Sequence, residues 1–101
     1  MAIVDRVKRQ VAGLLERIME PHGSCSMLDA RVLRHIDFRV PRCVRMHFKP
    51  TRPHSPAFLL TLAGIKEKVL ELRGVDHVVI EVVDVVDADR WTHAIEDHPS
   101  S

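Results

Sequence analysis

The chain has 101 residues, 46% of them hydrophobic, and a formal net charge of +1. This length predicts a single domain spanning residues 1–101. The near-neutral charge argues against a general nucleic-acid or membrane-surface binder. No apolar run approaches the roughly 20 residues of a membrane helix, and the N-terminus does not resemble a signal peptide. We therefore expect a cytoplasmic protein in which Cys25 and Cys43 are reduced, with a disulfide between them as the less favoured alternative.

The first element is expected to be a helix over residues 3–20. Apolar residues recur at steps of four and three, which is the spacing of one helix face. Pro21, followed by Gly23, is expected to end the helix. The apolar stripe consists of Ile3, Val7, Val11, Leu14 and Ile18.

Two alternating segments, 31–40 and 43–49, predict strands joined in a hairpin with Pro41 in the loop. Matching the apolar and polar faces of both strands at once gives one register, because a slip by one residue would set apolar beside polar. The apolar faces consist of Val32, Ile36, Phe38 and Val40 on the first strand and Val44, Met46 and Phe48 on the second. The register pairs Phe38 with Val44, Ile36 with Met46, Asp37 with Arg45 and His35 with His47.

A second helix is expected over Pro56–Leu72, and a Val-rich strand over residues 76–86. The tail from Asp87 to Ser101 is expected to dock through Trp91 and to fray over 96–101. The predicted fold class is α+β, in the order α-β-β-α-β. Both helices are expected to pack on one face of a three-stranded mixed sheet.

The segment before the second helix reads KPTRPHSPAF and is rich in proline. Ser55 is placed to cap the helix by accepting from the backbone N–H of Ala57 or Phe58, with Pro56 as the first helical residue. This capping role alone would explain the serine. The same helix N-terminus, with Thr51, Arg52 and His54 nearby, could also hold an anion, a thiolate or a metal-bound species.

Several short motifs, spread over about the whole chain, resemble those of a small domain family linked to iron–sulfur cluster assembly, which includes SufT, PaaD and the eukaryotic cytosolic cluster-targeting factors. Members have an acidic residue and proline after the first helix, a Thr-x-x-Gly-Cys-Pro turn before the second, and a Trp-bearing tail. The matching segments here are Glu20-Pro21, Met27–Leu33 with Asp29, Thr51 with Ser55-Pro56, Gly74-Val75 and Trp91-Thr92.

The resemblance implies an accessory or adaptor protein of cluster assembly that acts through protein contacts rather than as an enzyme. Ser55 stands where the family has its cysteine, and a hydroxyl is a poorer ligand for iron than a thiolate. A transient iron or iron–sulfur cluster would then need a substitute ligand, and Cys43 or Cys25 is a candidate, although a small packed residue is the simpler explanation for both. No metal ligand set is assigned.

Other constellations give weaker signals. His35 and His47 could bind a metal across the hairpin, but two ligands are too few, and a solvated polar face is the favoured interpretation. A non-catalytic interaction domain without a metal role is the alternative function, and a nucleic-acid binder ranks below both because the basic stretch lacks interleaved aromatics. We also expect a homodimer through the exposed side of the second helix. The basic stretch contains Arg34, Arg39, Arg42, Arg45, Lys49 and Arg52, and the dimer patch contains Ala57, Leu60, Thr61 and Gly64.

Overall fold

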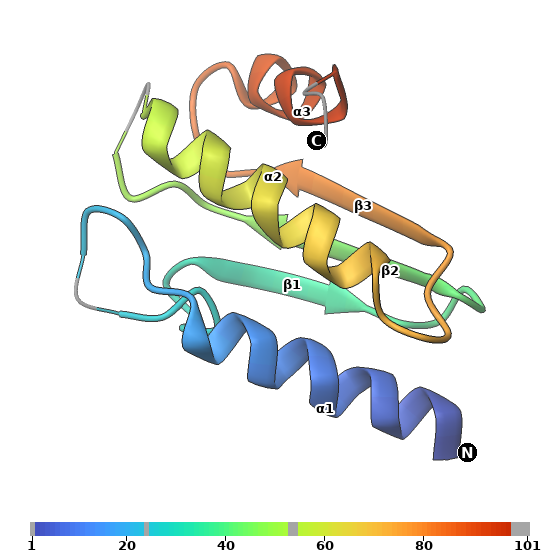
Figure 1. Cartoon of the computed structure of the whole chain (residues 1–101). Coiled ribbons are helices and arrows are strands. Elements are labelled where there is room, and N and C mark those ends of the chain that lie inside the picture. The colour runs from blue at the N-terminus through green and yellow to red at the C-terminus, as the bar shows by residue number, and fades with distance from the viewer. Residues whose placement is uncertain (1, 24, 53–54, 98–101) are drawn as a thin grey trace.

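The computed structural model describes residues 2–23, 25–52 and 55–97, and the side chains of residues 5–96 within these ranges. The elements of the described chain follow in the order α-β-β-α-β-α, an α+β fold (Figure 1). The predicted order of the first five elements is confirmed, and a further helix follows them. The elements are α1 (Ala2–Arg17), β1 (Leu33–Asp37), β2 (Cys43–Phe48), α2 (Pro56–Leu70), β3 (His77–Val82) and α3 (Ala88–Asp97).

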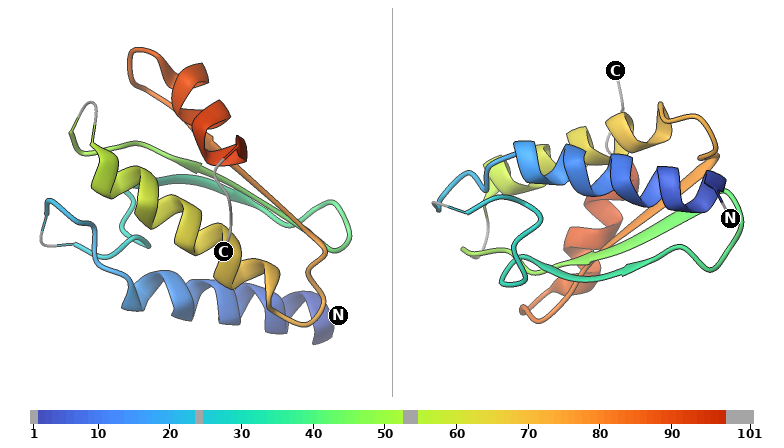
Figure 2. Two further views of the ribbon diagram at one scale, coloured as in Figure 1. Left: turned by 45° about the horizontal axis from the view of Figure 1, so that its top comes forward. Right: turned by 90° about the horizontal axis from the view of Figure 1, so that it is seen from below.

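The sheet is three-stranded and mixed, with β2 in the centre. β1 runs antiparallel to β2, and β3 runs parallel to it because α2 forms the crossover between them. The predicted hairpin register is confirmed for Ile36 with Met46, Asp37 with Arg45 and His35 with His47. As predicted, α1 and α2 lie on the same face of the sheet (Figure 2).

The first strand is shorter than its alternating pattern predicts. β1 ends at Asp37, so Phe38 lies beyond the ladder, although Phe38 and Val44 both pack into the core. Val40 was expected on the apolar face, but it is 60% exposed because the chain has already entered the turn there. Arg42 completes that turn in the left-handed region, with φ of 62°, and its carbonyl accepts from the N–H of Asp76 and His77.

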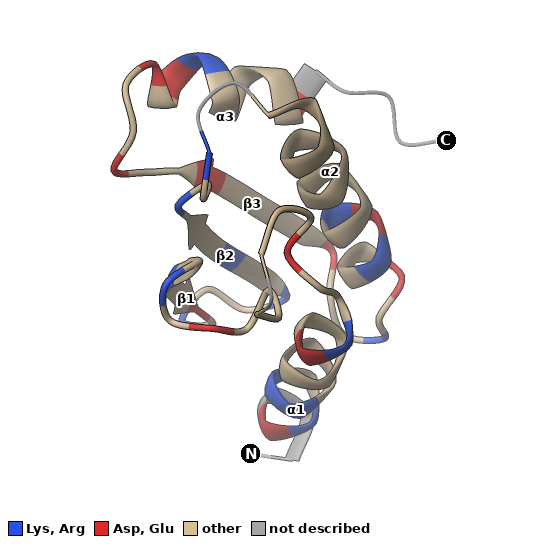
Figure 3. Cartoon of the chain, turned by 90° about the vertical axis from the view of Figure 1, so that its left-hand side faces the viewer, with Lys and Arg blue, Asp and Glu red and all other residues tan. Residues whose placement is uncertain are grey.

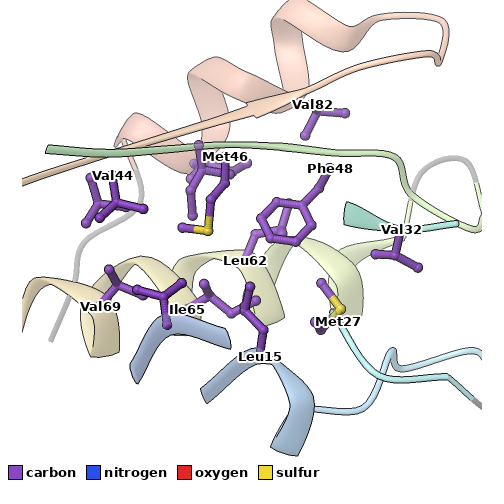
Figure 4. Close-up of a cluster of buried hydrophobic side chains, with 14 of the residues drawn as sticks. Leu15, Met27, Val32, Val44, Met46, Phe48, Leu62, Ile65, Val69 and Val82 are labelled. Carbon is purple, nitrogen blue, oxygen red and sulfur yellow. The ribbon is translucent and has the colours of Figure 1, made fainter. Parts of the chain in front are cut away.

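The core lies between the sheet and the two helices. Alternate residues of β2 and β3 point toward the helices, and the buried stripe of α2 meets them (Figure 4). These side chains are aliphatic, Met or Phe, as the low aromatic content requires. The central members are Val11 and Leu15 of α1, Val44, Met46 and Phe48 of β2, Leu62 and Ile65 of α2, and Ile80 and Val82 of β3.

A chain reversal follows α1, which ends at Arg17 instead of continuing to residue 20 as predicted. The backbone of Met27 donates to the Ile18 carbonyl at 2.8 Å, and that of Glu20 donates to the Cys25 carbonyl at 2.9 Å. The reversal carries Met27 back into the core, where it is fully buried. It also fixes the position of Glu20 beside the start of α2.

The tail forms α3, a helix that the sequence did not predict. The expected docking through Trp91 is confirmed: the indole is 9% exposed and meets Phe58 edge-on, with ring centroids 6.3 Å apart. The Val82 N–H donates to Thr92 Oγ1 at 3.0 Å, which ties α3 to the end of β3. The helix runs through residues 96 and 97, where fraying was expected, and residues 98–101 lie outside the described chain.

Candidate functional site

Ser55 caps α2 in the predicted way. Its backbone is extended, with φ −94° and ψ 108°, and Pro56 begins the helix. Ser55 Oγ accepts from the backbone N–H of Phe58 at 3.1 Å, and the residue is only 6% exposed. The hydroxyl proton of Ser55 remains free to be donated elsewhere.

The ring of His22 contacts this hydroxyl. The Nε2 atom of His22 lies 2.5 Å from Ser55 Oγ, although the two residues are 33 positions apart. A hydroxyl oxygen can accept two hydrogen bonds, so the tautomer of the His22 ring decides which of the two groups donates in this contact. The site thus contains a hydroxyl and an imidazole in direct contact, which is the nucleophile–base pair of many acyl-transfer enzymes.

The carboxylate of Glu20 is the buried anchor of the site, because the residue is only 2% exposed. Glu20 Oε1 accepts from Thr51 Oγ1 at 2.7 Å, and Oε2 accepts from the backbone N–H of His22 at 2.9 Å. These bonds compensate part of the cost of burying a carboxylate. A Cβ at Gly23 would come within 2.8 Å of Oε2, so any other residue here would require the Glu20 carboxylate to shift.

We call Glu20, His22, Thr51 and Ser55 the Ser55 cluster. Glu20 contacts the backbone of His22 and not its ring, so it does not orient the imidazole as the acid of a Ser–His–acid triad does. The cluster therefore joins two chain segments around a capped helix end. Its geometry supports a positioning role for Ser55 and Thr51.

An apolar cavity of about 350 Å³ lies beside the cluster, between the start of α2 and α3. This volume is at the lower end of the range for small-molecule sites, and it would also accept one or two side chains of a protein partner. Asp87 and Arg90 contribute the charged groups in its wall. The lining residues are Ser55, Pro56, Leu59, Asp87, Arg90, Trp91 and Ala94.

The remaining residues of the predicted turn are only partly brought together. Arg52 and Thr51 are both exposed, and Pro56 is exposed at the first helical position. His54 lies outside the described residues. Of the predicted turn, the structure thus joins Thr51 and Ser55 through the Ser55 cluster.

Asp29 has a local structural role. Its Oδ1 accepts from the backbone N–H of Arg31 at 2.9 Å and from Arg31 Nε at 3.0 Å. These bonds from Arg31 lower the pKa of the Asp29 carboxyl from 3.8 to about 2. Its carbonyl accepts from the N–H of Val32 and Leu33, so Asp29 organises the entry to β1.

Neither cysteine lies in the Ser55 cluster, and both are free thiols. Cys43 begins β2, whereas the cluster follows the end of that strand, so the two lie at opposite ends of β2. Cys43 is half-buried and borders a second cavity of about 230 Å³ with Val7, Phe38 and Val75. Cys25 is half-buried in the reversal after α1.

Acidic neighbours neutralise much of the basic stretch. Arg34 pairs with Asp84 at 3.9 Å, Arg39 with Asp37 at 2.8 Å, and Arg45 with Glu81 at 3.7 Å. Arg42 pairs with Asp76, and the bonds lower the pKa of the Asp76 carboxyl. Lys and Arg are accordingly intermixed with Asp and Glu over this side of the molecule (Figure 3).

Sequence reasoning missed Glu20 and His22 as site residues. Glu20-Pro21 was noticed only as a motif of the resemblance, and its acid followed by proline at the end of a helix was the available signal. His22 carried no local signal because its partner Ser55 is distant in sequence.

Known proteins add no further information about the site. No protein-family model, no curated protein and no solved structure matches this chain. None of the helices in the described residues is long and apolar enough to cross a membrane. Within the same ranges, no three His, Cys, Asp or Glu side chains are gathered, as they stand, around a point where a metal ion could sit.

Proposed function

We propose that this protein is an accessory or adaptor protein of iron–sulfur cluster assembly or metalloprotein maturation, which acts in the cytoplasm by protein contacts and not by enzymatic turnover. The observation that carries the proposal is the hydrogen bond between Thr51 and Glu20. The resemblance places these residues in separate motifs. Their contact beside Ser55 supports the idea that the motifs serve one site.

The cavity beside Ser55 is the contact surface in this proposal. Its walls are mostly apolar, with Trp91 as an aromatic anchor and Arg90 as a charged group at the edge. Aromatic residues and Arg are enriched at protein interfaces, where they carry much of the binding energy. Partners would be assembly factors or apo-metalloproteins that insert an apolar side chain between α2 and α3.

Ser55 determines how the site would work. A hydroxyl is a poor ligand for iron, and here it is already engaged by Phe58 and His22. Iron or a cluster would therefore be cargo held mainly by the partner, while Ser55 keeps the docking surface in shape. The same engagement favours the second candidate, an interaction domain without any metal role.

The test uses cells from which the gene has been deleted. We expect the activity of an iron–sulfur enzyme such as aconitase to fall at unchanged protein level, and to return when the extract is chemically reconstituted with iron and sulfide. Ala94→Arg, which fills the cavity, should fail to restore activity in vivo. His93→Arg on the exposed side of α3 is the matched control and should restore it.

Unchanged aconitase activity in the deletion strain would contradict the adaptor proposal. The metal-free interaction domain would then be the better description. A different result is that aconitase activity falls in the deletion strain and Ala94→Arg restores it as well as the wild-type gene does. That result would exclude the cavity as the contact surface.

A further inference from the structure

One row of polar side chains crosses all three strands. His35 of β1 lies opposite His47 of β2, and His47 is in register with Glu81 of β3. The residues on either side of His47, Met46 and Phe48, point into the core. Because side chains alternate along a strand, this row lies on the opposite face of the sheet.

We call the face of the sheet that carries His35, His47 and Glu81 the open face. The views in Figure 2 show α1 and α2 on the other side of the sheet, and α3 lies beyond the edge formed by β3. His35 is exposed, and His47 and Glu81 are half-buried. Solvent therefore reaches His35 and part of Glu81, whereas the Nε2 atom of His47 is buried.

The distances within the row are short, yet the described residues make no hydrogen bond in it. The ring centroids of His35 and His47 are 5.2 Å apart. His47 Nε2 lies 3.5 Å from Glu81 Oε2, which is within ion-pair range if the ring is protonated but longer than an ordinary hydrogen bond, and this buried nitrogen has no hydrogen-bond partner among the described residues. An imidazole nitrogen and a carboxylate oxygen thus face each other across a narrow gap.

The separation of His47 and Glu81 matches that of two ligand atoms on one metal ion, and the described residues form a set of three only if the His35 ring turns toward them. In a tetrahedral site with bonds of about 2.0–2.2 Å, neighbouring ligand atoms lie about 3.3 Å apart, and the centres of two imidazole rings about 5 Å apart. His35 is the one member that must turn to complete the set, and its ring is exposed. The sequence predicted that His35 and His47 pair across the hairpin, with a solvated polar face as the favoured interpretation, and the parallel pairing of β2 with β3 adds Glu81.

We propose that His35, His47 and Glu81 bind a divalent transition metal ion of the zinc class, with the fourth position open. Two imidazoles and one carboxylate suit Zn²⁺, Co²⁺ or Fe²⁺. Arg45 Nη1 lies 3.7 Å from Glu81 Oε1 and leaves Oε2 directed at His47. The positive charge of Arg45 reduces the affinity of the site for a cation. Its contact with Glu81 also holds the carboxylate in place, as residues around a metal site do for the metal ligands.

The full chain is tested by equilibrium dialysis against Zn²⁺ at pH 7.5, and Co²⁺ absorption reports the coordination geometry. We expect one ion per chain. His35→Asn, His47→Asn and Glu81→Gln should each weaken binding at least about tenfold, because loss of even an outer partner costs about 10–100-fold. His77→Asn and His93→Asn, which alter exposed histidines outside the row, should bind as the wild type does.

Circular dichroism without metal shows whether each variant folds, and ring resonances of His35 and His47 that shift with Zn²⁺ locate the ion. Absence of one-to-one binding by the wild type, or equal loss in the His77→Asn variant, would overturn the proposal. If His47 is instead protonated and paired with Glu81, the ring resonances will not shift when Zn²⁺ is added. That result would also overturn the proposal. None of these outcomes depends on the adaptor function.

Discussion

Thr51 donates its hydroxyl to Glu20 across 31 positions of sequence, and this bond fastens the reversal after α1 to the segment that leads into α2. Without it, Glu20 Oε1 would be a buried acceptor with no partner among the described residues. His22 is fixed by the other oxygen of the same carboxylate, and its ring then reaches Ser55. The shape of the candidate site thus depends on one buried carboxylate.

Thr51→Val tests that dependence. The variant keeps the shape of the side chain but leaves Oε1 unsatisfied, so we expect the free energy of unfolding in urea to fall by about 1–3 kcal/mol. Thr61→Val is the matched control. Among the described residues its hydroxyl donates to the Ala57 carbonyl within α2, and its loss should cost less than about 0.5 kcal/mol. Equal effects of the two variants would contradict the anchoring role of Glu20.

The acid stability of the protein should depend on Asp37. Hydrogen bonds from the Arg39 side chain and backbone lower the pKa of the Asp37 carboxyl from 3.8 to about 2. A carboxyl whose pKa is lower in the folded state stabilises the fold above its unfolded value, and the contribution is lost as the pH falls through the folded value. We therefore expect the melting temperature to fall between about pH 4 and pH 2.

Asp37→Asn should reduce the fall in melting temperature between about pH 4 and pH 2. High salt should also reduce this fall, because the Asp37–Arg39 pair is near the surface. The measurement is a series of thermal melts from pH 2 to pH 6. Asp29→Asn should flatten the same window, since the pKa of that carboxyl is also lowered to about 2. A wild-type curve without any slope between pH 4 and pH 2 would contradict both assignments.

Self-association through α2 remains a prediction. Leu60 is 59% exposed and Ala57 is exposed beside it. In the described part of the chain, no atom outside the helix lies within 4 Å of a Cβ built at Gly64. An exposed apolar patch next to a small residue allows a second helix to approach closely. In sedimentation equilibrium we expect a dimer, and Leu60→Lys should convert it to a monomer.

Leu70→Lys is the control for that experiment, because Leu70 is partly exposed on the same helix but lies outside the patch. The control variant should remain dimeric. A wild-type chain that stays monomeric at high concentration would remove this prediction.

The sheet register could be predicted because the pattern constrained both faces at once. Asp37 opposite Arg45 and Ile36 opposite Met46 are compatible with only one pairing, since a slip exchanges the two faces. The crossover through α2 likewise required β3 to run parallel to β2. The Ser55 cap followed from local chemistry and was confirmed.

The features that could not be predicted depend on contacts between segments that are distant in sequence. α3 has few apolar residues, and Trp91 and Ile95 form its buried face only because Phe58 and β3 lie beneath them. His22 reaches Ser55 only after the reversal has turned the chain, and no periodicity encodes that turn. Glu81 joins His47 through a register that depends on where β3 docks.

Ser55→Cys tests whether the turn is prepared for the thiol that the resemblance places there. The new side chain would replace a hydroxyl that now contacts Phe58 N–H and His22 Nε2, at the positive end of α2. The Phe58 N–H and the helix dipole stabilise a thiolate, and His22 does so when its Nε2 carries a proton. We expect the introduced thiol to react with iodoacetamide at neutral pH faster than Cys25 and Cys43, which serve as internal references within the same chain.

Ser55→Ala separates structure from chemistry in the same experiment. It should lose about 1 kcal/mol of stability through the missing cap and leave the alkylation rates of Cys25 and Cys43 unchanged. The Ser55→Cys variant should also bind iron or zinc more tightly than the wild type at this site, measured in the His47→Asn background to exclude the open face. An introduced thiol that reacts no faster than the references would mean that the turn is not prepared for thiolate chemistry. The resemblance would then concern the fold alone, and a metal-free interaction domain would be the preferred description.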